Sequence, residues 1–159
     1  LFRWDNHIEP AVHEPLVSSV DVVPTILAAA GLASEIPDLP GHNLLPSATG
    51  AEPLEDRPVF GEIYPGDATT LGHPSGDIAY RWVRRGEYKL IVPQAHNGQP
   101  PWGDYLAEPA LFNVVHDPQE QHNLIGDRSD ASLQAELQTL LDDWWQPGND
   151  AAVQRPTID

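Results

Sequence analysis

The sequence contains no cysteine and no methionine among its 159 residues. Without cysteine, these residues offer no disulfide, no zinc–thiolate site and no cysteine nucleophile. No apolar run approaches the roughly 18–20 residues that a membrane-spanning helix needs. Because a translated product starts with methionine, a chain that begins at Leu1 is expected to be either a processed protein or a fragment.

Positive charge is also scarce, since 8 Lys and Arg residues stand against 24 Asp and Glu residues and give a formal net charge of −16. Lys89 is the single lysine. Proteins bind nucleic acids and anionic membranes largely through cations, so this balance argues against both partners. The acidic excess predicts a soluble, strongly solvated surface. Adaptation to high salt is a second interpretation, and the sequence does not decide between them.

What the chain does contain is typical of a globular protein, with 40% hydrophobic residues and five tryptophans. A helix is predicted from about residue 20 to Gly31. Ser19 or Asp21 can cap it, Pro24 falls in its first turn, and Gly31 can adopt the left-handed conformation that ends a helix. Residues 33–58 are rich in Pro, Gly, Ser and acidic side chains and predict a long connection.

The rest of the chain predicts a small sheet with one helix. Four short segments rich in aromatic and β-branched residues predict strands, at Pro58–Tyr64, Ile78–Arg84, Tyr88–Val92 and Leu111–Val115. Arg85–Glu87 predicts a tight hairpin turn. The sequence from Asp117 to Glu120 is typical of a helix start. After it, leucines and tryptophans between Leu133 and Trp145 predict a long helix with one apolar stripe.

No pattern of chemistry-bearing residues forms a recognisable active site. The seven histidines form no close metal-binding pair, and the sequence lacks nucleophile-elbow, phosphate-loop and dinucleotide-binding motifs. We therefore assign no catalytic residue and no metal ligand to this chain. Glu62 is the notable carboxylate because it lies within an apolar strand, where a half-buried charge needs a partner. Arg81 or Arg84 on the neighbouring strand is the expected partner.

Five short motifs, each weak alone, occur in an order that resembles the sulfatase family. Residues 17–31 resemble V-S-x-x-D-x-x-P-T-x-L-x-x-A-G, and Gly41–Pro46 resembles G-x-S-L-x-P, with Asn43 where serine is usual. Val59–Glu62 resembles the family's pattern V-F-x-E, and Arg81–Ile91 resembles R-x-V-R…Y-K-L-I. Leu111–Leu124 resembles the closing pattern L-Y-x-L-x-x-D-P-x-E-x-x-N-L.

This resemblance implies an α+β segment of an α/β sulfatase-type fold. Residues 1–56 would form the last part of the catalytic α/β domain. Residues 57–147 would form a C-terminal subdomain with a four-stranded antiparallel sheet and a covering helix, and residues 148–159 a flexible tail. The helix near residues 22–27 would then lack the large sheet that it covers in the family, which would leave an apolar patch exposed.

The resemblance also implies what this chain lacks. Sulfatases use a formylglycine made from Cys or Ser in a C/S-x-P-x-R motif, and they bind calcium through an early Asp-Asp pair and a later Asp-Asn or Asp-Gln. None of these motifs occurs here, so the chain alone is expected to be inactive. Its implied partners are a missing N-terminal catalytic portion, which would hold the nucleophile and the calcium ligands, and a sulfated small molecule or carbohydrate.

Substrate selection is the role that the resemblance leaves to this chain. Two long polar loops, Pro65–Asp77 and Pro93–Pro109, are expected to close over the site. Within them, His73, His96 and Trp102 are the candidate substrate-binding residues. Two alternatives stay open: a phosphonate or phosphate ester hydrolase of the same superfamily, and a non-enzymatic binding module that folds by itself. Localisation is also left open.

Overall fold

The computed structural model describes residues 1–33, 39–66, 72–94, 105–126, 131–146 and 148. The chain divides into two compact units, which we call the N-terminal unit, Leu1–Val59, and the C-terminal unit, Phe60–Asp159. Each unit has its own packing.

The N-terminal unit contains the predicted first helix. A 3-10 turn, η1 (Ser19–Asp21), leads into α1 (Val22–Ala29), and a second short helix, α2 (Leu45–Ala48), follows the connection. The helix ends as the sequence predicts: Gly31 has a φ of +72°. Beyond it, the Leu32 amide donates to the Leu27 carbonyl at 2.8 Å. This bond satisfies one of the carbonyls that a helix end leaves free.

Asp21 has a larger structural role than the predicted helix cap. Its side chain is fully buried. One carboxylate oxygen accepts the Ser18 amide at 2.7 Å, and the other accepts the His42 amide at 2.8 Å. The guanidinium of Arg57 pairs with the same carboxylate. Asp21 therefore joins the start of α1, the segment before α2 and the segment before the first strand.

The outer side of α1 is apolar and exposed. Val22, Val23 and Ile26 expose 39%, 52% and 57% of their surface. A helix with this much apolar exposure stabilises the fold weakly, because little of its apolar surface leaves water. The exposed patch expected on this helix is present.

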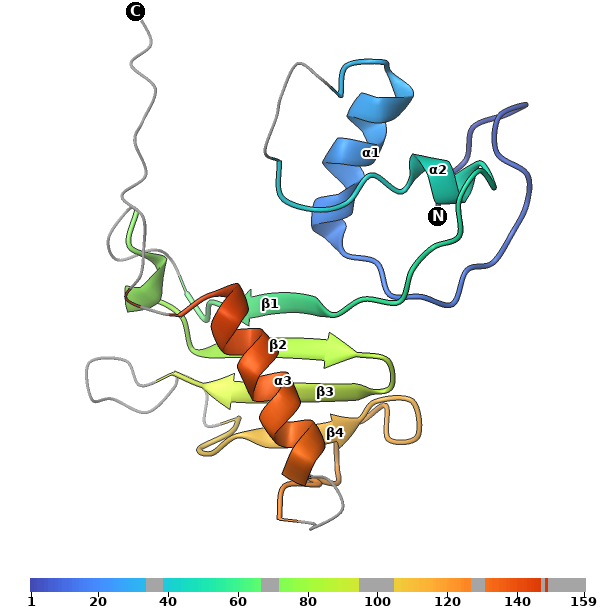
Figure 1. The fold of residues 1–159 in the computed structure, drawn as a ribbon. Helices are drawn as coiled ribbons and strands as arrows, with labels where there is room; N and C mark the ends of the chain where they lie inside the picture. Colours follow the sequence, from blue (N-terminus) through green and yellow to red (C-terminus); the bar gives the residue numbers. More distant parts are fainter. Residues whose placement is uncertain (34–38, 67–71, 95–104, 127–130, 147, 149–159) are drawn as a thin grey trace, which may run out of the picture. The chain divides into compact units, whose positions relative to one another are not determined.

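The C-terminal unit is built on a four-stranded sheet with the strands in chain order (Figure 1). Neighbouring strands run antiparallel, and the strands are β1 (Val59–Ile63), β2 (Tyr80–Arg85), β3 (Tyr88–Pro93) and β4 (Ala110–Asn113). Arg85 pairs with Tyr88 in the β2–β3 register, which leaves a two-residue turn. Gly86 in this turn has a φ of +55°, a conformation typical of tight hairpins.

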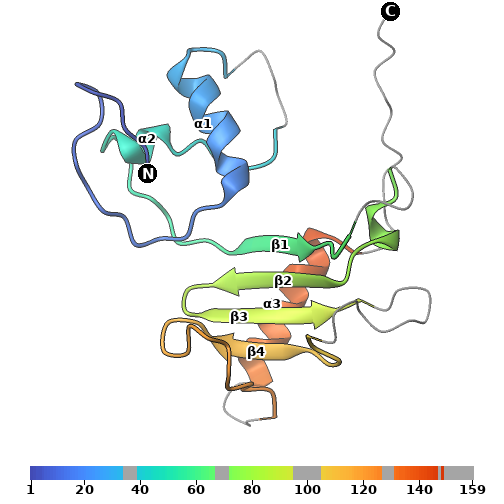
Figure 2. The ribbon, with the colours of Figure 1, turned by 180° about the vertical axis from the view of Figure 1, so that it is seen from behind.

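One helix, α3 (Ala131–Trp144), covers one face of the sheet. Figure 2 shows the strands in front of α3, so the helix lies on a single side. Leu137 and Leu141 are fully buried in one hydrophobic cluster with Val83, Leu90 and Leu111. These leucines lie one turn apart on the helix, as the predicted apolar stripe requires. The α+β fold class predicted from the sequence is confirmed.

The predicted helix start at Asp117 is wrong, because residues 117–126 contain turns and no helix. The Asp117 carboxylate does accept backbone amides, from Gln121 and His122 at 2.8 Å each. Glu120, however, has a φ of +54°, and a left-handed residue cannot continue a right-handed helix. The motif therefore closes a turn after β4.

Candidate functional site

The β1–β2 and β3–β4 connections of the C-terminal unit leave the sheet at the same end. The Ala79 amide donates to the Ile63 carbonyl at 2.9 Å, and the Gln94 amide donates to the Ala79 carbonyl at 2.8 Å. Ile91 pairs with Ala110 in the β3–β4 register. The β1–β2 and β3–β4 connections therefore start and finish side by side, at the left of the sheet in Figure 1. We call this the loop end of the sheet.

The three candidate substrate-binding residues belong to these connections. His73 is exposed and directly precedes a 3-10 turn, η2 (Pro74–Gly76), whose last amide donates to the His73 carbonyl at 3.1 Å. His96 and Trp102 lie outside the described residues. Substrate contact by His73, His96 and Trp102 therefore stays a prediction, and the structure adds that their two loops share one end of the sheet.

A polar cluster that the sequence analysis missed lies on the sheet face opposite α3. Lys89 Nζ donates to Glu120 Oε1 at 2.7 Å, and the Tyr105 hydroxyl donates to Glu120 Oε2 at 2.7 Å. The Lys89 ammonium also lies 5.6 Å from the ring centroid of Trp82, within the range of a cation–π interaction. We call Lys89, Glu120 and Tyr105 the Glu120 clamp. The one available signal was that the only lysine and Glu120 both occur in family-like motifs.

The electrostatics of the clamp favour one protonation state. Burial alone raises the pKa of Glu120, but the hydrogen bonds from Lys89 and Tyr105 outweigh it and hold the pKa below its ordinary value. Burial and the hydrogen bond to Glu120 raise the pKa of Tyr105 to about 12. At neutral pH, an ionised carboxylate therefore accepts from a protonated phenol and an ammonium, which makes both hydrogen bonds charge-assisted.

The expected partner of Glu62 is not found, since the described residues contain no ion pair between Glu62 and Arg81 or Arg84. Arg81 Nη2 instead donates to Asp142 Oδ1 at 3.0 Å, and its Nη1 donates to the carbonyls of Leu141 and Trp145. The α3 terminus thus supplies the acceptors that Glu62 was expected to supply. Burial raises the pKa of Glu62, partly offset by a backbone hydrogen bond.

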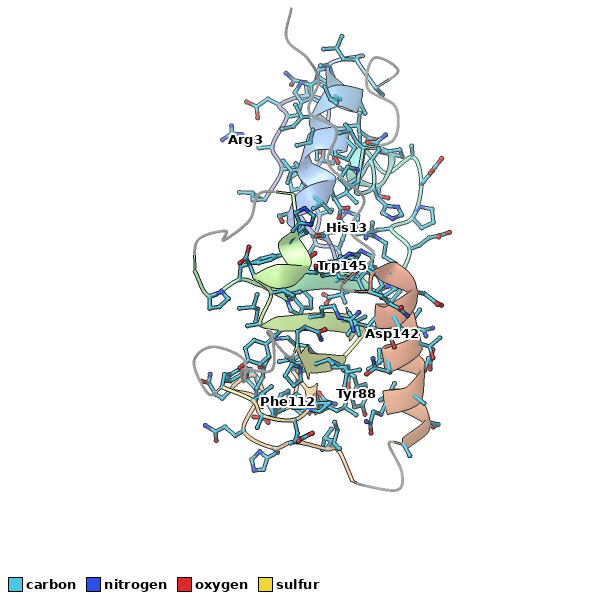
Figure 3. All side chains as sticks on the ribbon, turned by 90° about the vertical axis from the view of Figure 1, so that its left-hand side faces the viewer. Arg3, His13, Tyr88, Phe112, Asp142 and Trp145 are labelled. Atoms are coloured by element: carbon cyan, nitrogen blue, oxygen red, sulfur yellow. The ribbon has the colours of Figure 1, made fainter. Side chains whose placement is uncertain are left out.

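Figure 3 looks onto the loop end and separates the two faces of the sheet. Asp142 and Trp145 lie on the α3 side, and Phe112 lies on the other side. Phe112 belongs to a second hydrophobic cluster with Tyr80 and Ile91. The Arg81 contacts therefore anchor α3, whereas the Glu120 clamp acts on the opposite face, where the β3–β4 connection returns.

The described part of the chain offers binding and positioning groups. Within these residues, no group of three or more His, Cys, Asp or Glu side chains is arranged to hold a metal ion. Among the described helices, none has the length and apolar character needed to cross a bilayer.

The chain is similar in sequence to known sulfatases. No protein-family model matches the chain. In sequence it is 29% identical to human arylsulfatase A over 77% of this chain and 25% of the relative. It is 25% identical to the ulvan-active sulfatase of Formosa agariphila over 93% of this chain and 32% of the relative. The chain thus spans about a quarter to a third of the curated relatives it matches, which fits a C-terminal portion.

Solved structures show the same fold. A sulfatase-like protein of Bacteroides fragilis aligns with 92% of this chain and 29% of its own length, at a TM-score of 0.68 and 19% identity. BT4656, solved with D-glucosamine-2-N,6-O-disulfate, aligns with 85% of this chain and 25% of its own length, at a TM-score of 0.56 and 24% identity. The phosphonate monoester hydrolase of Agrobacterium radiobacter aligns with 82% of this chain and 25% of its own length, also at a TM-score of 0.56 and 24% identity.

Proposed function

We propose that this chain, which is similar to sulfatases in sequence and in fold, is the C-terminal portion of a sulfatase-type hydrolase that cleaves sulfate esters. The observation that carries the proposal is the sequence similarity to the ulvan-active sulfatase along 93% of the chain. In this proposal, residues 1–56 complete the catalytic α/β domain, residues 57–147 form the C-terminal subdomain and residues 148–159 form a tail.

The reactive groups are assigned to the rest of the protein. Sulfate ester cleavage needs a nucleophile and a cation that neutralises the sulfate oxygens. The sequence has no C/S-x-P-x-R motif for a formylglycine, and the described residues do not fit a calcium site. We therefore derive no step through either group for this chain, and we expect the isolated chain to be inactive.

This chain would contribute structure and substrate selection. The two connections at the loop end of the sheet are long and polar, and such loops on a rigid scaffold commonly carry binding residues. His73, His96 and Trp102 are the proposed substrate contacts. A sulfated small molecule or carbohydrate is the proposed substrate class, supported by the ulvan-active sulfatase and by the BT4656 complex with a disulfated glucosamine.

A phosphonate or phosphate ester hydrolase is the second candidate. The phosphonate monoester hydrolase aligns with this chain at the same TM-score and identity as BT4656. Sulfate, phosphate and phosphonate esters are all tetrahedral and anionic, so the C-terminal fold does not select between them. A binding module without enzymatic activity has less support, because the exposed apolar side of α1 favours a chain that packs against further protein.

The decisive experiment uses the intact protein encoded by the gene that contains this chain. We expect it to hydrolyse an aryl sulfate faster than an aryl phosphonate, and we expect no turnover of either ester by Leu1–Asp159 alone. Faster phosphonate cleavage would favour the second candidate. Turnover by the purified short chain, or a gene that encodes neither a formylglycine motif nor early Asp ligands, would contradict the proposal. Cooperative folding of the short chain without exposed apolar surface would favour the binding module.

A further inference from the structure

Arg84 is the one Lys or Arg side chain in the described part of the chain that has no carboxylate partner. The other described side chains of these two types all form ion pairs. Arg84 Nε donates to the Gly86 carbonyl at 3.1 Å. Glu87, the acidic residue closest to Arg84 in the sequence, instead accepts from Asn113 Nδ2 at 3.1 Å. Because a guanidinium has several N–H donors, the hairpin contact leaves the two Nη groups of Arg84 available to an anion.

Lys89 lies directly across the hairpin from Arg84, since the two residues pair in the β2–β3 register. Their neighbours Val83 and Leu90 pack with the leucines of α3. Side chains alternate between faces along a strand, so both cations lie on the other face of the sheet. Like charges at directly opposite positions destabilise a sheet. Glu120 pairs with Lys89, and its one carboxylate offsets only one of the two cations.

Trp82 supplies an aromatic surface beside the two cations, on the sheet face that is turned to the viewer in Figure 2. Its ring lies against Gly61 of β1, where a Cβ would lie 2.5 Å from a ring atom. The Lys89 ammonium lies 5.6 Å from the ring centroid. Trp82, Arg84 and Lys89 are all partly exposed, whereas Tyr80 is buried on the same face nearer the loop end. We call these three partly exposed side chains the Arg84 patch.

The Arg84 patch combines two ways of holding a sulfated sugar. A guanidinium binds oxyanions through two parallel N–H donors, and such charge-assisted hydrogen bonds are the stronger ones. An indole ring offers a flat apolar surface, on which the C–H face of a sugar ring can lie. The formal net charge of the chain is −16, so the rest of its surface repels a polyanion and directs it to this patch.

We propose that the Arg84 patch binds a sulfated saccharide chain, with the Arg84 guanidinium on a sulfate group and the Trp82 ring against a sugar ring. The choice of ligand rests on the proposed function, which gives a sulfated carbohydrate as the substrate class. Arg84 lies beyond Tyr80 on β2, about 13 Å along the strand from the loop end. The patch therefore holds part of a polymer that extends past the two loops.

Arg84→Gln is the direct test, and Arg85→Gln is the matched control. Both variants remove one positive charge from β2, but Arg85 lies on the α3 side, where it pairs with Glu136. Electrophoresis of the intact protein through gels that contain dextran sulfate compares their affinities, because the two variants have equal net charge. We expect the affinity of Arg84→Gln to be about fivefold lower than that of the wild type, and that of Arg85→Gln to stay within about twofold, since a partly exposed charge pair contributes modestly.

The polymers and a conservative variant separate the parts of the patch. Arg84→Lys keeps the charge but loses the two-donor geometry, so its affinity should fall between those of the wild type and Arg84→Gln. Polyvinyl sulfate carries sulfate groups without sugar rings, so it should bind more weakly than dextran sulfate. Equal binding of the two polymers would overturn the saccharide assignment. Equal losses in Arg84→Gln and Arg85→Gln would overturn the site, because net charge alone would then explain both.

Thermal midpoints show which variants fold. Unchanged affinity of folded Arg84→Gln would overturn the site, and so would wild-type affinity of Arg84→Lys if Arg84→Gln does not fold. An intact protein that hydrolyses sulfate esters but does not bind dextran sulfate would overturn this inference alone. An intact protein that hydrolyses neither sulfate nor phosphonate esters would overturn the proposed function, whatever its affinity for dextran sulfate.

Discussion

The carboxylate of Asp21 pairs with the guanidinium of Arg57, 36 residues further along the chain, inside the N-terminal unit. The Asp21 side chain is fully buried, and the Arg57 side chain is 19% exposed. The same carboxylate accepts the backbone amides of Ser18 and His42. A buried charge is tolerated only when its partners are all present, so this one residue holds three segments of the unit in a single arrangement.

Asp21→Asn should lower the free energy of unfolding by about 3 kcal/mol, because it leaves Arg57 without its counter-charge in a buried site. Urea unfolding followed by circular dichroism measures the loss. Asp5→Asn is the control, since its pair with Arg3 is largely exposed, at 69% and 81%, and such pairs contribute about 0–1 kcal/mol. Equal losses in the two variants would contradict the role given to Asp21.

Gly41→Ala should be more harmful than Gly50→Ala, although both glycines have a positive φ. A Cβ at Gly41 would lie 2.4 Å from the Val20 carbonyl oxygen, whereas a Cβ at Gly50 would meet no atom within 4 Å. Gly50→Ala then reports the backbone cost alone, about 1 kcal/mol, and Gly41→Ala adds a clash with backbone. Thermal unfolding of the two variants separates these contributions. A loss at Gly41 no larger than at Gly50 would show that the segment can shift.

Arg81→Ala should destabilise the C-terminal unit by about 3 kcal/mol, because Arg81 is 6% exposed and joins β2 to Asp142 and to two carbonyls at the end of α3. Arg85→Ala provides a matched control on the same strand and helix. The side chains of Arg85 and Glu136, which form an ion pair, are each about half exposed. The expected loss of unfolding free energy is therefore below about 1 kcal/mol. The comparison uses urea unfolding monitored by tryptophan fluorescence, and similar losses would argue against the anchoring role.

Much of the fold could be predicted because the local signals agree with the tertiary packing. Short segments rich in aromatic and β-branched residues placed four strands, and the positive φ that Gly31 adopts agrees with the predicted helix end. The turn at Asp117 could not be predicted, because Asp117-Pro118 and Glu120 fit a helix cap and a turn equally well in the sequence. The choice depends on Lys89 and Tyr105, which come from distant segments and hold Glu120 in a left-handed conformation.

The candidate site was harder to predict than the fold for the same reason. Period-two alternation shows which residues share a sheet face, but it does not say which cation meets which carboxylate. Arg81 and Arg84 looked equally able to pair with Glu62, yet alternation places them on opposite faces, and Arg81 meets Asp142 instead. Loop residues have no periodicity at all, so His73, His96 and Trp102 could be proposed only from the family resemblance and from the place of their loops between strands.

Salt should stabilise this chain. Five of the six described Lys and Arg side chains are in ion pairs with carboxylates, and they are Arg3, Arg57, Arg81, Arg85 and Lys89. With a formal net charge of −16, most carboxylates therefore repel one another, and salt screens this repulsion over distances of about 10 Å at 0.1 M and about 3 Å at 1 M. We expect the thermal midpoint to rise between 0.1 and 1 M KCl. A midpoint that is highest in dilute buffer would rule out adaptation to high salt.

The carboxylates of Glu120 and Glu62 should make the stability of the fold depend on pH in opposite directions. The pKa of Glu120 is lowered in the folded state, so its stabilising contribution is present above the ordinary value of 4.5 and is lost as the pH falls through the lowered value. The pKa of Glu62 is raised, so ionisation above that raised value weakens the fold. Glu120→Gln should therefore destabilise the chain at pH 7 and have less effect near pH 4, whereas Glu62→Gln should stabilise it slightly at pH 7 only. Urea midpoints at both pH values test this, and a midpoint of Glu120→Gln at pH 7 that equals or exceeds that of the wild type would contradict the pairing of Glu120 with Lys89.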